Sequence, residues 1–284
     1  MKVGVIDVGG GFRGIYATGV LDYCQDNNIE FDIALAISAG SANLASFLSR
    51  QRGRNYTFYT DYAFRKQYAS LGNFIRKRSY IDMEYVFGTL SNHDGENPLD
   101  YAALRDNPAE FVIIATDAET GEAAYFDKSD LAQDSYDPFK ASSSIPFVCK
   151  PYVINGKAYF DGALGNPIPV EKAFEMGCDL VVLILTKPEG KPREQGSDPK
   201  IAKLIQRKYP KSAEMLRLRA EHYNAGVALA QEYAKQGKLL IVSPDDTCGV
   251  DTLHKDKESL DKLYNKGLQD GQKVKDFLIT HGVI

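Results

Sequence analysis

Three short segments of the sequence combine residue types that could carry out nucleophilic chemistry. Residues 9–14 form a glycine-rich run, Ser38 stands between small residues, and Asp161 is followed by Gly162 and Ala163. A serine hydroxyl becomes a useful nucleophile when a nearby base accepts its proton, and its attack creates a negative charge that needs hydrogen-bond donors. Together the segments indicate a nucleophile, a base and a place for an anion.

The glycine run fits the pattern G-x-G-x-x-G, which permits several interpretations. It follows a predicted strand, Lys2–Ile6, and precedes a predicted helix, where a dinucleotide fingerprint would lie. That fingerprint also needs an acidic residue at the end of the second strand, but Ser38 stands there and Asp32 lies at its start. A P-loop is excluded because no Lys-Ser or Lys-Thr follows the glycines. An oxyanion hole and a tight turn without a ligand remain. The run comprises Gly9, Gly10, Gly11, Phe12, Arg13 and Gly14.

Ser38 lies where a predicted strand, Ile33–Ile37, turns into a predicted helix. Such a junction is typical of a nucleophile elbow, in which small residues two positions either side let strand and helix approach closely. Here those residues are Ala36 and Gly40, with alanine where glycine is usual. The alternative is that Ser38 only caps the helix, a role that Ser41 could also fill.

The base is either Asp161 or a histidine. Asp161 ends an aromatic strand and precedes glycine, which suits a carboxylate held against a serine but is also common in plain turns. The order Ser38, Asp161 and a later histidine would satisfy a hydrolase triad, although the elbow of such hydrolases follows several strands. The histidines lie in polar, helical or terminal sequence typical of a surface: His93, His222, His254 and His281.

Strands alternate with helices along the chain, which predicts a three-layer α/β/α fold with a mostly parallel central sheet. Asn155-Gly156 predicts a type I′ hairpin between Pro146–Ile154 and Lys157–Phe160, and residues 51–100 predict irregular helices and loops. We expect one domain over 1–284, with the motifs within 1–190 and a helical part, 191–284. The other predicted strands are Phe111–Thr116, Glu122–Phe126, Leu180–Leu185 and Leu239–Val242; the predicted helices are Pro169–Met176, Ile201–Gln236 (one or two) and Leu253–Leu278.

Composition narrows the functional class. The chain has 284 residues, 34 Lys+Arg against 38 Asp+Glu and a net charge of −4, which argues against a nucleic-acid-binding domain. Four scattered cysteines predict neither a metal site nor disulfides, and the longest apolar run is too short to span a bilayer. The N-terminal sequence lacks the features of a signal peptide, so we expect a cytoplasmic protein.

The three motifs, in this order and on these strand ends, resemble the signatures of patatin-like phospholipases. The segments 115–122, 141–146 and 165–170 are also similar to that family. The resemblance implies a Ser-Asp dyad without histidine, metal or cofactor, with Ser38 as nucleophile and Asp161 as general base. It also implies that N–H groups around Gly10, Gly11 and Phe12 hold the oxyanion, and that Arg13 helps to fix the loop or the electrostatic potential of the site. Ala36 and Val8 depart from the glycine and the acidic residue that many members carry.

The resemblance also implies a lipid or acyl-ester substrate: a phospholipid, a lysophospholipid, a monoacylglycerol or a simple ester. The sequence does not choose among these, nor does it specify an oligomeric state. The aromatic region from Tyr56 to Tyr68, with Arg65 and Lys66, could line an acyl groove, make peripheral membrane contact or face the core, and the core is favoured. A non-catalytic acyl-lipid binder with the same fold is the competing hypothesis.

Overall fold

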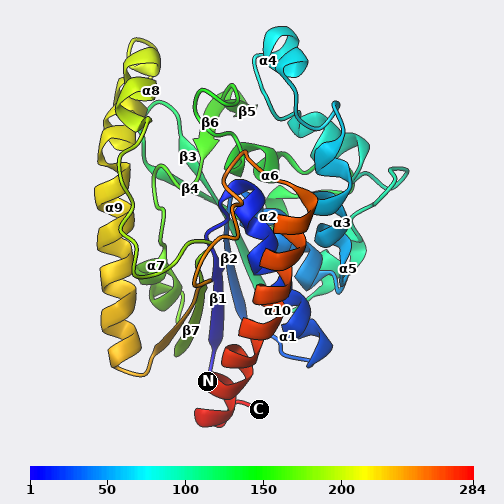
Figure 1. Ribbon diagram of the computed structural model, residues 1–284, viewed down its shortest axis with the longest axis vertical. Helices are drawn as coiled ribbons and strands as arrows, with labels where there is room; N and C mark the ends of the chain where they lie inside the picture. The colour runs from blue at the N-terminus through cyan, green and yellow to red at the C-terminus, as the bar shows by residue number, and fades with distance from the viewer.

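A mixed β-sheet forms the centre of the computed structural model, which describes residues 1–284 (Figure 1). The strands lie in the order β5-β6-β3-β2-β1-β7-β8, and β4 pairs with β3. Neighbours among β3, β2, β1, β7 and β8 are parallel, whereas β4, β5 and β6 join through antiparallel pairs. The strands are β1 Val3–Asp7, β2 Ile33–Ile37, β3 Glu110–Asp117, β4 Ala123–Phe126, β5 Tyr152–Ile154, β6 Lys157–Asp161, β7 Leu180–Ile184 and β8 Leu239–Val242.

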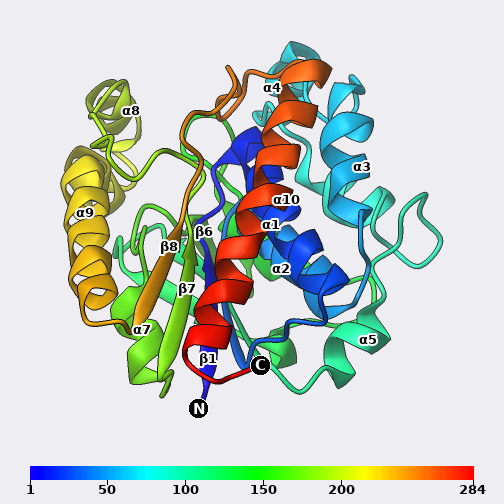
Figure 2. The same ribbon diagram turned by 60° about the horizontal axis from the view of Figure 1, so that its bottom comes forward.

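Helices cover both faces of this sheet (Figure 2). Every residue of β1, β2 and β7 is buried, as expected for strands that lie between two helical layers. Helices α1, α2 and α10 pack on one face, and α7 and α9 lie on the other. The three-layer α/β/α prediction is therefore confirmed. The helices are α1 Ile15–Asp26, α2 Ala39–Leu48, α3 Arg54–Thr60, α4 Leu71–Lys77, α5 Tyr101–Asp106, α6 Asp137–Ser142, α7 Val170–Glu175, α8 Asp198–Ile205, α9 Pro210–Lys235 and α10 Lys257–Thr280, with short turns η1 Gly11–Gly14, η2 Tyr62–Phe64, η3 Tyr85–Thr89 and η4 Lys128–Asp130.

The hairpin prediction is correct in its turn and wrong in the extent of its first strand. Asn155 and Gly156 have φ of 50° and 80°, as a type I′ turn requires. The strand begins only at Tyr152, not at Pro146, because the preceding residues form a turn in which the Cys149 N–H donates to the Ile145 carbonyl.

Residues 51–100 form short helices and turns above the sheet. Phe58, Tyr59 and Tyr62 are buried in the main hydrophobic core, so the core-facing prediction is confirmed for them. Phe64 is 48% exposed, and no residue of α4 is buried. This region therefore contributes both core and surface. No helix of the protein combines the length and apolarity needed to cross a bilayer.

The last helix, α10, packs along α1 through glycines in both helices. A Cβ atom on Gly267 would lie 2.1 Å from the carbonyl oxygen of Tyr16, and one on Gly19 would lie 2.2 Å from that of Tyr264. Strand β8 extends the sheet beside β7. We therefore propose that residues 191–284 fold together with residues 1–190 as one domain.

Replacing Gly267 with alanine tests this close contact. Alanine favours a helix interior over glycine by about 1 kcal/mol, but at Gly267 the added methyl group should force α1 and α10 apart. We expect Gly267→Ala to destabilise the whole chain by about 1–3 kcal/mol in urea unfolding followed by circular dichroism.

The matched control is Gly72→Ala in α4, where the nearest atom to a new Cβ is the Ser70 hydroxyl at 3.6 Å. This variant should be as stable as the wild type or slightly more stable. An unchanged midpoint for Gly267→Ala, or two separate unfolding transitions in the wild type, would contradict the one-domain proposal.

Candidate active site

The register of the sheet brings Ser38 and Asp161 together. Ile37, the last residue of β2, lies opposite Ile114 of β3, and Asp161 of β6 lies opposite Ala115. At both positions, β4 pairs with the opposite edge of β3. Strands β2 and β6 therefore share the remaining edge of β3, and the pairing with β6 begins where the pairing with β2 ends. Ser38 and the Asp161 carboxyl group consequently meet beside consecutive residues of one strand.

Ser38 has the strained backbone expected of a nucleophile elbow. Its φ is 55° and its ψ is −127°, between the end of β2 and the start of α2. Its N–H donates to the Ser142 hydroxyl at 2.8 Å, which in turn donates to the Ile114 carbonyl at 2.6 Å. The Ser41 hydroxyl donates to the Ser38 carbonyl at 2.6 Å. The Ser38 side chain makes no capping hydrogen bond, so the helix-cap alternative is not supported.

Asp161 is almost completely buried, with 4% of its surface exposed. Its carboxylate accepts the Ala163 N–H at 2.9 Å, and its own N–H donates to the Ser144 carbonyl at 2.9 Å. Burial raises the pKa of Asp161, while the neighbouring Ser38 hydroxyl, the charge of Arg219 and the Ala163 N–H act in the opposite direction. The carboxylate is therefore more basic than an exposed aspartate, and it lines the same cavity as Ser38.

The segment 142–144 supports both of these residues. Ser142 holds the backbone of Ser38, and the carbonyl of Ser144 holds that of Asp161. The sequence showed this serine run only as part of a family resemblance, without a role. Three glycines of the motifs approach neighbouring residues too closely for a side chain: Gly40 at Asp7, Gly14 at Tyr59 and Gly162 at Ile114.

The glycine loop approaches the elbow from behind. Gly9 has φ of 66°, and a Cβ atom there would lie 2.3 Å from the Ile37 carbonyl oxygen, so only glycine fits. The N–H groups of Gly10 and Gly11 have no acceptor within the protein. The N–H of Phe12 donates to the Thr252 carbonyl at 3.2 Å. Because the Phe12 N–H already has an acceptor, the backbone N–H groups of Gly10 and Gly11 are the remaining candidates to bind an oxyanion.

Arg13 is buried beneath the loop that follows β8. Its guanidinium forms an ion pair with Asp251 and donates to the Thr252 hydroxyl at 3.0 Å. Together with the Phe12 bond, these contacts attach the glycine loop to the C-terminal part of the chain. Two residues depart from the family pattern. Ala36 is fully buried in β2, and Val8 is buried in a hydrophobic cluster that also contains Ile6 and Ile37.

A buried pair that sequence analysis missed links the glycine loop to α2. The Asp7 carboxylate accepts the Gly9 N–H at 2.8 Å and the Asn43 side-chain amide at 2.9 Å, and that amide also donates to the Gly14 carbonyl at 3.0 Å. Burial raises the pKa of Asp7 to about 6. The sequence could have indicated Asp7, because it ends β1 and the carboxyl ends of parallel strands meet at the edge of the sheet where ligands bind.

Ser38 lies where two cavities of different character meet. One is mostly apolar and encloses about 700 Å³ of empty space, including its open mouth. The other is polar, also contains Asp161 and encloses about 1320 Å³ on the same measure. Apolar side chains of the first include Phe58, Tyr59, Tyr68, Met83, Val86 and Phe87. An ester bond at Ser38 would thus have room for an acyl chain on one side and for an alcohol on the other.

No histidine lines either cavity. His93 contacts Asp134 at the surface, and His254 is exposed. No group of three or more His, Cys, Asp or Glu side chains could hold a metal ion. Of the candidate bases named from the sequence, Asp161 lines a cavity together with Ser38 and the histidines do not.

Comparison with known proteins identifies the family. The model of the patatin-like phospholipases matches residues 8–174, which is more than half of the chain and includes all three motifs. The chain belongs to the patatin-like phospholipase family. Members of this family act on lipid esters, and the α/β/α sheet described above is the patatin fold. A second family model, a domain of unknown function called DUF6363, matches residues 209–278.

Two further proteins are similar to this chain. The uncharacterized protein YjjU of Escherichia coli strain K12 is 29% identical over 189 residues, which are 66% of this chain and 52% of YjjU. The chain thus matches about half the length of that relative. The crystal structure of VipD from Legionella pneumophila aligns with a TM-score of 0.48 and 11% identity, over 97% of this chain and 66% of VipD.

Replacing Ser142 tests its support of the elbow. Ser142→Ala leaves the buried Ser38 N–H without its acceptor, which should lower the free energy of unfolding by about 1–3 kcal/mol. The neighbouring Ser143 hydroxyl is buried without any partner, so Ser143→Ala should be neutral or stabilising in the same urea titration. Equal stability of the two variants would show that Ser142 does not hold the elbow.

Proposed function

We propose that the protein hydrolyses carboxylic esters of fatty acids, with Ser38 as nucleophile and Asp161 as general base. The observation that carries this proposal is the strained Ser38, whose hydroxyl lies against a buried carboxylate where an apolar and a polar cavity meet. Phospholipase A, lysophospholipase and carboxylesterase activities all fit this arrangement.

In the proposed reaction, the Asp161 carboxylate accepts the Ser38 proton as the serine oxygen attacks the ester carbonyl. The N–H groups of Gly10 and Gly11 stabilise the negative charge on the former carbonyl oxygen. When the bond to the alcohol breaks, Asp161 returns the proton to the departing alcohol, and the acyl group remains on Ser38. Water, deprotonated by the same carboxylate, then releases the fatty acid and restores the serine.

The raised pKa of Asp161 suits this role. A carboxylate with an ordinary pKa near 4 is a weak acceptor for a serine proton, and burial makes it a stronger one. The apolar cavity is the proposed site of the acyl chain, because its aromatic and aliphatic walls replace water around the chain.

A non-catalytic acyl-lipid binder remains the alternative function, since the same cavities could hold a lipid. The strained backbone of Ser38 favours catalysis, because such a conformation costs about 1–3 kcal/mol and binding alone does not need it.

Chemical labelling and mutation test the dyad together. We expect a fluorophosphonate to label Ser38 alone, as located by peptide mapping. Ser38→Ala and Asp161→Asn should each reduce kcat/KM for nitrophenyl esters roughly 10³-fold or more. Activity of the wild type should fall as the pH drops through the raised pKa of Asp161, because the protonated carboxyl group cannot accept a proton. Full turnover without Ser38 would favour the binder.

We also propose a cytoplasmic location and peripheral contact with a membrane. All four cysteines are free thiols, as in proteins of reducing compartments. For the membrane we propose the α4 surface, which consists of the exposed apolar residues Phe64, Leu71, Phe74, Ile75 and Phe147.

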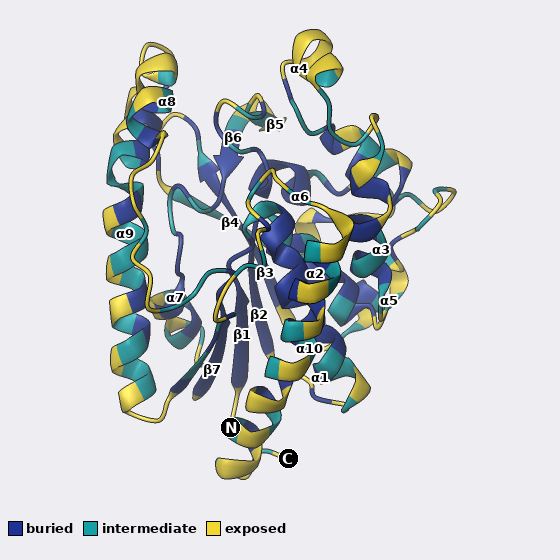
Figure 3. Ribbon diagram, viewed as in Figure 1, coloured by how far each residue is buried: buried dark blue, intermediate teal, exposed yellow.

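The α4 surface combines apolar and basic groups. Helix α4 projects from the body of the protein and is largely exposed (Figure 3), with Leu71 and Ile75 74% and 80% exposed. No acidic residue occurs between Phe64 and Arg78. The basic residues of this segment are Arg65, Lys66, Arg76, Lys77 and Arg78. Tyr68 and Ile81, which flank α4, line the apolar cavity. Contact of this surface with anionic lipid would place the cavity near the bilayer.

Vesicle sedimentation tests the α4 surface. We expect the wild type to bind vesicles of phosphatidylcholine and phosphatidylglycerol, and Leu71→Ser with Ile75→Ser to weaken binding at least 10-fold, because each apolar side chain buried contributes about 1.5–3 kcal/mol. Ile279→Ser removes a comparably exposed side chain from the end of α10 and should leave binding unchanged. Equal losses for both variants would contradict the assignment of the surface.

A further inference from the structure

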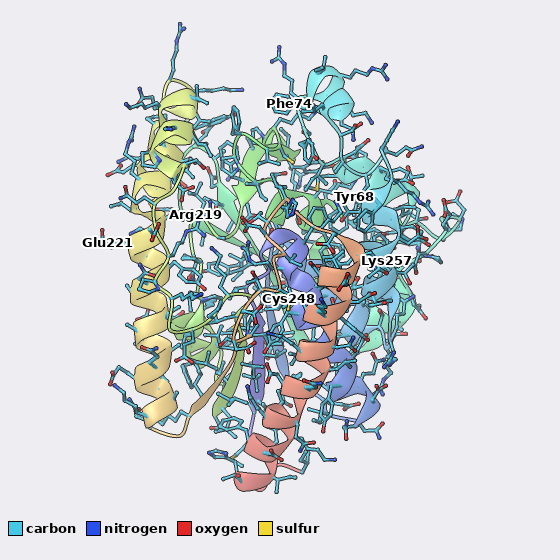
Figure 4. The ribbon with its side chains drawn as sticks, in the orientation of Figure 1. Tyr68, Phe74, Arg219, Glu221, Cys248 and Lys257 are labelled. Atoms are coloured by element: carbon cyan, nitrogen blue, oxygen red, sulfur yellow. The ribbon has the colours of Figure 1, made fainter.

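The polar cavity contains a cluster of buried and half-buried cations at the side of Ser38 where the alcohol part of an ester would lie. Lys187, Arg193 and Arg219 line this cavity, as does Tyr223. All four lie outside residues 8–174, the part of the chain that matches the patatin-like family. They come from the segment after β7 and from α9, where Arg219 points towards the middle of the molecule while Glu221 points away (Figure 4).

The buried acidic partners do not balance these cations. Asp198, with 7% of its side chain exposed, is shared between Arg193 at 3.3 Å and Arg219 at 3.6 Å. Lys187 forms no ion pair. Among the buried and half-buried groups, the three cations against Asp198 leave two positive charges, or one when Asp161, which also faces Arg219, is ionised. Glu194 also lines the cavity, but it is exposed and forms no ion pair, so solvent screens its charge. Arg13, the fourth cation of the cavity, has its own partner in Asp251.

Several donors at this place have no acceptor within the protein. The Nε atom of Arg193 is buried and unpartnered. The guanidinium of Arg219 makes no hydrogen bond within the chain, and its closest acidic contact is the 3.6 Å ion pair. The Lys187 ammonium and the Tyr223 hydroxyl also make no hydrogen bond. Half-buried donors without acceptors are costly unless a ligand or ordered water satisfies them.

The cluster is positioned by the fold and is not a chance meeting of surface side chains. The backbone N–H of Arg193 donates to the Asn224 side chain at 2.7 Å, and the Asn224 amide donates back to the Arg193 carbonyl at 3.0 Å. These bonds attach the segment after β7 to α9. Lys187 lines the same cavity as Arg13 and Arg193, and burial together with their charges lowers its pKa.

We infer that Lys187, Arg193 and Arg219, with the Tyr223 hydroxyl, form a binding site for a phosphate group on the alcohol part of the substrate. A phosphate carries up to two negative charges and several acceptor oxygens, which match the excess charge and the free donors better than a single carboxylate would. This inference rests on the proposed function, because the position of Ser38 defines which cavity receives the alcohol. It assigns to α9, within the match to the domain of unknown function, a role in substrate selection.

A matched pair of substrates tests the site. The probes are a 1-acylglycerol 3-phosphate and the 1-acylglycerol with the same short acyl chain, both used below their micelle concentrations. We expect the wild type to prefer the phosphate ester, and Arg193→Gln or Arg219→Gln to lower the ratio of the two kcat/KM values about 10- to 100-fold, mainly through KM. The ratio is the readout because loss of Arg219 also changes the charge near Asp161 and so affects both substrates.

The control variant is Arg217→Gln, on the same helix, whose guanidinium contacts Gln206 outside the cavity. It should leave both rates unchanged. A wild type without preference for the phosphate ester, or a ratio that is unaffected by Arg193→Gln and Arg219→Gln, would overturn the inference.

Binding of glycerol 3-phosphate separates this inference from the proposed hydrolase activity. Calorimetric titration with glycerol 3-phosphate should give binding to the wild type that weakens at least 10-fold in Arg219→Gln, even if no ester is hydrolysed. In assays with a neutral nitrophenyl ester, glycerol 3-phosphate should inhibit competitively. Non-competitive inhibition would instead indicate a separate site for free phosphate and would contradict the headgroup assignment. Absence of nitrophenyl ester turnover would count against the hydrolase alone.

Discussion

The backbone of Ser38, at φ 55° and ψ −127°, can persist only because buried contacts hold it on several sides. Such a conformation costs a residue with a side chain about 1–3 kcal/mol. Ser142 accepts its N–H, Ser41 binds its carbonyl, and Gly9 lets the glycine loop pass close behind Ile37. The same contacts set the position of the loop relative to the serine. The contacts that hold Ser38 in its strained conformation therefore also position the glycine loop beside it.

Burial and charge act in opposite directions on Asp161, and both are needed for the proposed chemistry. Burial raises its pKa, which makes the carboxylate a better proton acceptor, whereas Ser38 and Arg219 favour its charged form. A carboxyl group with burial alone would tend to stay protonated, and one with full exposure would be too weak a base. The cations of the polar cavity thus influence the base as well as the space for an alcohol.

The C-terminal part of the chain is built into this site. Strand β8 extends the sheet, α10 packs against α1, and the Thr252 carbonyl binds the Phe12 N–H. Helix α9 brings Arg219 to the polar cavity. The polar cavity beside Ser38 is lined both by residues of the family signatures, such as Gly10 and Asp161, and by residues beyond the family match, such as Arg219.

Sequence alone determined the strands, the elbow and the chemical types at the site. The apolar run Ile33–Ile37 followed by Ser38, and the Asn155-Gly156 turn, depend on neighbours within a few residues, where periodicity and backbone preferences act. The same local rules failed at Pro146, because the segment before Tyr152 is bonded to a distant part of the chain: the Tyr80 N–H donates to the Val148 carbonyl and the Lys150 N–H to the Ser79 hydroxyl.

The partners of these residues were decided only by the tertiary structure. Ser38 and Ser142 are 104 residues apart, and no local pattern indicates that their backbone and side chain meet. Three other contacts also join residues that are far apart in the sequence: the Phe12 N–H with Thr252, Asp7 with Asn43, and Arg193 with Arg219 around Asp198. Hydrogen bonds and charge pairs depend on which distant segments the sheet register and helix packing bring together, and a pattern along the chain carries no record of that distance.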